Sequence, residues 1–210
     1  MLQLEESKGI PRKILLMMAI VSGLTVANLY YNQPLLEDIR KDIGINEFQA
    51  NLITFITQAG YALGLLFVVP LADMWSRRRI IATSMVLATI MTLVIATTQH
   101  IGILWAASLV LGICSVVPQI FVPMARLYSR PEHKSQNMGI VLSGLLSGVL
   151  GARVLSGYIG DWFDWRTMFY IAAAIMLICL CITLRALPQM QPSYKGSFGG
   201  LMRSIISIYK

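Results

Sequence analysis

Long apolar runs, separated by short polar segments, divide the chain into six stretches. They cover about residues 14–36, 51–70, 80–98, 101–124, 138–160 and 167–187. Each is about long enough to cross a hydrocarbon core of about 30 Å as a helix. No strand-like alternation of apolar and polar positions is present, and only helices or closed barrels satisfy their backbone groups in lipid. The pattern predicts an all-α membrane protein, with a bundle of six transmembrane helices over residues 1–187 and a cytoplasmic linker over 188–210.

Composition supports a membrane location. Of the 210 residues, 56% are hydrophobic and 13% are charged, and the mean hydropathy is +0.68. A soluble domain has a charged share nearer about 25%. The net charge of +7 does not indicate nucleic-acid binding, because the cations are scattered through short loops instead of gathering on one face. We therefore expect the lipid bilayer as a partner and no nucleic acid.

The cations also predict the orientation of the chain. Under the positive-inside rule, short loops rich in Lys and Arg stay in the cytoplasm. Alternate loops and the two terminal segments hold thirteen of the 17 cations: Lys8, Arg12, Lys13, Arg77, Arg78, Arg79, Arg126, Arg130, Lys134, Arg185, Lys195, Arg203 and Lys210. The other face holds three, Arg40, Lys41 and Arg166. We therefore predict a multi-pass protein of the inner membrane with both termini in the cytoplasm.

Enzyme chemistry has little support in the sequence. The three cysteines lie in apolar runs, where a thiol behaves as a small buried hydrophobe. His100 and His133 fall in predicted loops on opposite faces of the membrane, so neither is placed to act as the base that a serine nucleophile needs. We expect no catalytic residue, no metal and no cofactor.

The stretch V-P-L-A-D-M-W-S-R-R-R over residues 69–79 resembles a motif of the major facilitator superfamily, usually written G-x-L-a-D-r-x-G-r-R-x. The matching positions are Leu71, Ala72, Asp73, Arg77 and Arg78, whereas Val69, Met74 and Ser76 differ. The resemblance implies the N-terminal half of a twelve-helix secondary transporter that exports small molecules by alternating access. The chain stops inside the next predicted element, so we expect a C-terminal six-helix half as a partner. The alternative is an independent six-helix protein, either channel-like or a structural membrane subunit.

A faint internal repeat supports this fold. Asp73 is followed five residues later by Arg78, and Asp161 is followed five residues later by Arg166. The two pairs lie at the junctions of the second and third predicted helix and of the fifth and sixth, on opposite faces of the membrane. We predict that the first three and the last three helices form two inverted repeats.

Polar residues at helical spacing are candidates for a substrate site. The first group is Asn28, Tyr31 and Asn32 in the first run, and the second is Thr54, Thr57, Gln58 and Tyr61 in the second run. The resemblance places the first helix beside the substrate path, although Tyr30 and Tyr31 can instead be interfacial anchors.

Arg153 is the only charge within an apolar run, where it costs about 2.5–3.5 kcal/mol near the membrane centre. We expect it to face a cavity and bind an anionic or hydrogen-bonding substrate group; the alternative is snorkelling to the surface. The predicted binding set is Asn28, Tyr31, Asn32, Gln58 and Arg153.

The resemblance also implies a gate, formed by Asp73, Arg77 and Arg78, with Arg126 as an expected ion-pair partner of Asp73. A solvated loop aspartate is the alternative. In the fifth run, small residues predict close helix packing at Gly144, Gly148, Gly151 and Gly157. In the fourth run, Pro118 and Pro123 predict kinks, with Gln119 bonding a freed carbonyl. No run holds Asp, Glu or His in its interior, so no proton-carrying site is predicted.

Overall fold

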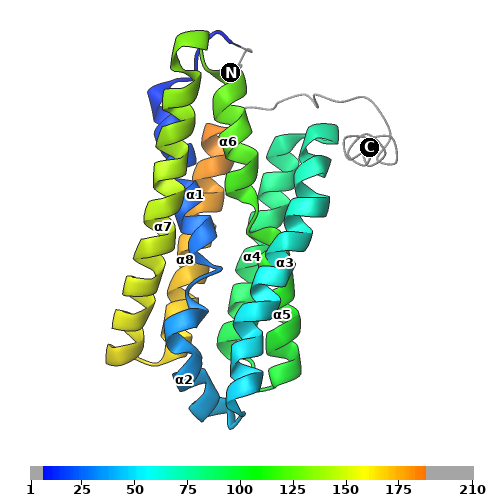
Figure 1. Cartoon of the computed structure of the whole chain (residues 1–210), viewed down its shortest axis with the longest axis vertical. Coiled ribbons are helices and arrows are strands. Elements are labelled where there is room, and N and C mark those ends of the chain that lie inside the picture. The colour runs from blue at the N-terminus through cyan, green and yellow to red at the C-terminus, as the bar shows by residue number, and fades with distance from the viewer. Residues whose placement is uncertain (1–6, 188–210) are drawn as a thin grey trace.

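The computed structural model describes residues 7–187, apart from the side chain of Asp73, and the predicted linker at 188–210 lies outside the described residues. The elements are α1 (Arg12–Ala27), α2 (Asn32–Ile43), α3 (Glu47–Met74), α4 (Arg77–Thr97), α5 (Ile101–Cys114), α6 (Val117–Tyr128), the short 3₁₀ helix η1 (Pro131–His133), α7 (Lys134–Trp162) and α8 (Trp165–Ala186). The helices run side by side along one axis (Figure 1). Within residues 7–187, six segments are long and apolar enough to span a membrane, which confirms the predicted number.

Two of the six spans are broken helices. The first span consists of α1 and α2, and the fourth consists of α5 and α6. Pro34 and Pro118 explain both breaks, because each lies just inside the second helix, where a proline ring has no N–H to donate and clashes with the carbonyl four residues earlier. The first span also extends to Ile43, seven residues beyond its predicted end. Pro123, by contrast, lies inside the continuous helix α6.

The packing of the helices follows the predicted inverted repeat. The strongest contacts join α1 to α7, α3 to α5 and α4 to α8. In the inverted repeat, the first, second and third spans correspond to the fourth, fifth and sixth. Under this correspondence the contact of α1 with α7 becomes the contact of α5 with α3, and the contact of α4 with α8 becomes itself. The two broken spans also correspond to each other. The bundle is therefore two inverted three-helix units.

Arginines bind α4 and α8 to each other at both ends of the bundle. Arg78, the second residue of α4, donates from Nη2 to the carbonyl of Leu184 on α8 at 2.6 Å. Arg166, the second residue of α8, donates from Nη1 to the carbonyls of Ala96 and Thr98, at 3.0 and 2.9 Å. The last carbonyls of a helix lack partners within it and carry partial negative charge. Each antiparallel helix thus satisfies the C-terminal end of the other.

Glycines allow α7 to approach α1 closely. A Cβ at Gly144 or Gly148 would collide with the backbone of Ala19 or Gly23. Gly151 differs from the expectation, because a Cβ there would meet open space, and at Gly157 it would make an ordinary contact with Pro34. Only the first two of the four predicted glycines therefore lie on the α1 contact, one helical turn apart.

Candidate functional site

The break in the first span buries a polar residue in the bundle. Asn28 directly follows α1 as its C-cap and is only 2% exposed. Neither its amide nitrogen nor its amide oxygen has a hydrogen-bond partner among the described residues. A buried polar group without a partner costs about 1–3 kcal/mol. Asn28 therefore offers a donor and an acceptor that the described residues leave unused.

A second asparagine connects the break to α3. Asn32, the first residue of α2, donates from Nδ2 to Oγ1 of Thr57 at 3.3 Å, and Thr57 donates to the carbonyl of Ile53. The Oδ1 atom of Asn32 and Oγ1 of Thr54 have no partner among the described residues. Gln58 is half-buried on α3, next to Thr57 in the chain. Unused polar atoms therefore lie on both sides of the contact between α2 and α3.

One hydrogen bond joins α3 to the second broken span. Gln119 on α6 donates from Nε2 to the hydroxyl oxygen of Tyr61 at 2.9 Å. This differs from the expectation that Gln119 would bond a freed carbonyl. We define the central polar cluster by seven buried or half-buried polar residues: Asn28, Asn32, Thr54, Thr57, Gln58, Tyr61 and Gln119. Both broken spans contribute to it.

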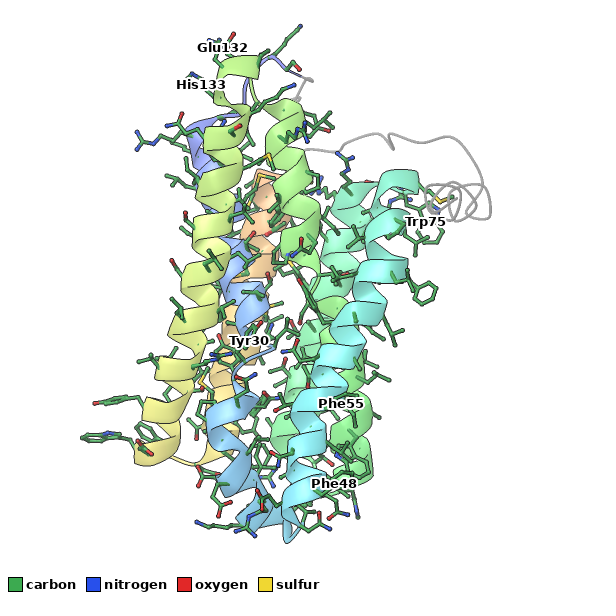
Figure 2. All side chains as sticks on the ribbon, viewed as in Figure 1. Tyr30, Phe48, Phe55, Trp75, Glu132 and His133 are labelled. Carbon is green, nitrogen blue, oxygen red and sulfur yellow. The ribbon has the colours of Figure 1, made fainter. Side chains whose placement is uncertain are left out.

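Arg153 on α7 lies over an aromatic ring. Its guanidinium carbon is 5.1 Å from the ring centroid of Tyr30, which belongs to the break, about midway along the bundle (Figure 2). A cation over a ring gains about 0.5–2 kcal/mol, depending on how far the pair is desolvated. Arg153 is exposed and has no carboxylate partner among the described residues. The sequence indicated Tyr30 only as an interfacial anchor, and no helical spacing links it to Arg153.

Tyr31 faces a different part of the bundle. Its side chain is buried and lines a groove of about 690 Å³ between α1 and α7, together with Gly148 and Ala152. Asn32, the next residue, contacts α3. The structure therefore separates the predicted binding residues into Asn28 buried at the break, Asn32 and Gln58 at α3, Tyr31 in the groove, and Arg153 beside Tyr30.

The predicted gate residues lie at one end of the bundle, which we call the arginine end. Arg77 is buried, Arg78 binds α8 as described above, and Arg126 is exposed on α6 with no hydrogen bond or ion pair to another described residue. The side chain of Asp73 lies outside the described residues, so its pairing with Arg126 stays a prediction. Within the described part of the chain, no cluster of His, Cys, Asp and Glu fits a metal ion.

Comparisons with known proteins agree with the fold. Residues 15–208 match the family model of the Major Facilitator Superfamily. The chain is 36% identical over 196 residues to the putative uncharacterized transporter YgaY of Escherichia coli K12, covering 93% of this chain and 50% of that protein. It is 35% identical over 192 residues to the probable transporter SCO4007 of Streptomyces coelicolor, covering 91% and 45%. The chain thus spans about half the length of these relatives.

A solved structure gives the same result for the fold. A bacterial homologue of the human lysosomal transporter Spinster, in an inward-facing and unoccupied conformation, superposes with a TM-score of 0.74 at 16% identity. The match covers 89% of this chain and 45% of that one. Together with the six spans and the inverted repeat, these matches show that the chain belongs to the Major Facilitator Superfamily.

Proposed function

We propose that the chain forms one six-helix half of a secondary transporter, which exports small molecules by alternating access. The observation that carries the proposal is the unpaired amide of Asn28 at the break of the first span. Non-helical backbone at membrane depth is tolerated only where protein buries it or where it lines a cavity. In many transporters, broken helices of this kind form the substrate site between two repeats.

The substrate contacts follow from the unused polar atoms. Asn28 supplies an amide donor and an acceptor, and Asn32 supplies an acceptor. Gln58 adds a half-buried amide on α3, and Arg153 adds a positive charge beside the ring of Tyr30. A second six-helix half would cover these substrate contacts and move against the first half. Relatives named multidrug resistance protein D, at 25% identity, and bicyclomycin resistance protein homolog, at 23%, support export as the direction.

In the proposed orientation the protein lies in the inner membrane, and the arginine end of the bundle faces the cytoplasm. Both termini are on the cytoplasmic side. Thirteen loop cations support this orientation under the positive-inside rule. Asp73, Arg77, Arg78 and Arg126 then surround the inner gate, and Asp73 braces it through a neighbouring helix end.

The test replaces Asn28 by leucine in the protein expressed from its complete reading frame. Removing an unpaired buried amide while keeping its approximate volume leaves stability unchanged or raises it. Transport should nevertheless fall about twofold to tenfold, since one hydrogen bond to the substrate contributes about 0.5–1.5 kcal/mol. Efflux of a panel of dyes and antibiotics from loaded cells measures the loss.

The matched control is Ser22→Ala on α1, which also removes a buried, unpaired oxygen, but one that lies six residues before Asn28. It should transport normally. If Asn28→Leu transports at the parental rate, Asn28 is not a substrate contact. A flux that does not saturate with substrate would favour the channel-like alternative over a transporter.

A further inference from the structure

A long apolar groove lies between α1 and α8, away from the central polar cluster. Its volume is about 640 Å³, within the range of sites that enclose small ligands. Leu16, Ile20 and Leu24 line it from α1, and Ile175, Ile178 and Ile182 line it from α8. The only charged residue in the lining is Lys13, at the arginine end of the groove. The groove is therefore apolar along its length and positive at one mouth.

The groove has the length of one membrane leaflet. From Lys13 to Leu24 the helix advances about 16 Å, at about 1.5 Å for each residue. Half of a hydrocarbon core is about 15 Å. A chain that lies in the groove with its polar head at Lys13 would therefore end near the middle of the membrane.

Three cations gather at this mouth. Arg12 and Lys13 begin α1, and Arg185 lies in the last turn of α8, three residues beyond the groove residue Ile182 and so on the same face. All three are exposed, and none forms a hydrogen bond or ion pair with another described residue. Their charges are thus available to an outside anion.

We propose that this groove binds an anionic phospholipid, with one acyl chain against Ile20 and Ile178 and the phosphate group held by Arg12, Lys13 and Arg185. Basic pockets between transmembrane helices are typical sites for anionic head groups. A second transporter half is a less suitable occupant, because the unused polar groups near Asn32 and Tyr61 lie toward α3 and α6, whereas the groove opens at α8. The inference does not depend on the substrate or on transport.

The experiment measures lipid binding to the purified 210-residue chain by native mass spectrometry in detergent. Phosphatidylglycerol and phosphatidylcholine with identical acyl chains are added in turn. Phosphatidylglycerol should bind more tightly, and each cation removed should weaken it about fivefold, the fold-change equivalent to about 1 kcal/mol for each Lys or Arg near the head group. The triple variant Arg12→Gln, Lys13→Gln, Arg185→Gln should bind both lipids equally.

The matched control for charge is Arg79→Gln, which removes an exposed cation at the arginine end on α4 instead of beside the groove. It should keep the preference for phosphatidylglycerol. Equal binding of the two lipids by the unmodified chain, which requires no variant to fold, would overturn the proposal. A loss with Arg79→Gln as large as that with Lys13→Gln would also overturn it, because the attraction would then be non-specific.

The position of the acyl chain is tested by filling the groove with a larger side chain. Ile178→Trp introduces a large side chain at a residue that is 60% exposed within the groove, and Leu150→Trp does the same at a residue that is 67% exposed on α7. Phosphatidylglycerol binding should fall at least about fivefold with the first variant only. Unchanged binding with Ile178→Trp would place the acyl chain elsewhere and reject the groove as its site.

Discussion

Replacing Arg166 by glutamine should destabilise the bundle more than any other single change of charge at the end opposite the arginine end. The guanidinium donates to two carbonyls at the end of α4 and, from Nη2, to Oδ2 of Asp42 on α2 at 2.7 Å. It also lies 4.4 Å from the ring of Trp165. Glutamine cannot make these contacts together, so α2, α4 and α8 lose a common cation.

The magnitude follows from burial. The side chain of Arg166 is 15% exposed, so its bonds to the carbonyls count nearly in full, at about 2–3 kcal/mol for the guanidinium as a unit. Asp42 is 45% exposed, so the ion pair adds only about 0.2–1 kcal/mol. The expected loss is about 3 kcal/mol. For a chain of this length, it lowers the Tm by about 6–12 °C.

Thermal unfolding of the purified chain in detergent, followed by far-ultraviolet circular dichroism, measures the loss. Arg78→Gln removes one carbonyl bond at the arginine end and should lower the Tm by about half as much. Lys41→Gln is the matched control, since Lys41 is 66% exposed and, among the described residues, pairs only with Glu37, at 3.4 Å. It should change the Tm by less than about 2 °C. Equal effects of Arg166→Gln and Lys41→Gln would refute the assignment of Arg166 as a shared cap.

Three further predictions concern packing, transport and topology. Gly148→Leu should destabilise the chain by at least about 1–3 kcal/mol, because the side chain meets the backbone of α1, whereas Gly151→Ala should be neutral or slightly stabilising; both are measured as Tm. Arg153→Gln and Arg153→Lys, in the protein expressed from its complete reading frame, should insert normally yet lower efflux at least about tenfold, because neither side chain is a charged bidentate donor. If Arg153→Gln transports at the parental rate, Arg153 only snorkels to the membrane surface. A cysteine at Ser135, in the first turn of α7, should react with an impermeant thiol reagent only after cells are permeabilised, since this end of α7 is predicted to be cytoplasmic. Ready labelling in intact cells would reject the topology.

The six spans and their inverted repeat could be predicted because both depend on the length of each apolar run and on where the charged residues fall between the runs. Apolar length predicts where helices cross the membrane, and the cations at Arg77 and Arg166 mark junctions. The break at residues 28–31 could not be predicted in the same way. Hydropathy stays high through it, and Pro34 lies near the end of the apolar run, where it resembles the end of a helix.

The same break explains why the sequence did not predict which binding residues lie on the same face of the first span. Helical spacing predicts a shared face for Asn28, Tyr31 and Asn32, but the spacing holds only within a continuous helix. At the break, Leu29 and Tyr30 donate to carbonyls three residues back, so α2 begins with a new rotation. Asn32 consequently contacts α3 while Tyr31 faces α7.

The two Asp–Arg pairs of the repeat, Asp73 with Arg78 and Asp161 with Arg166, mark matching positions as the sequence suggests, but the carboxylate that Arg166 binds is not Asp161. Arg78 and Arg166 perform the same task, binding the end of the antiparallel partner helix, so the symmetry of the fold accounts for both. Arg166 takes its carboxylate from Asp42 in the first span. This ion pair ties α2 to α4 and α8, whereas the residues between α1 and α2 have no comparable anchor to that helix pair among the described contacts. We therefore expect the first span to bend at residues 28–31, beside the unpaired amide of Asn28, when the bundle changes conformation.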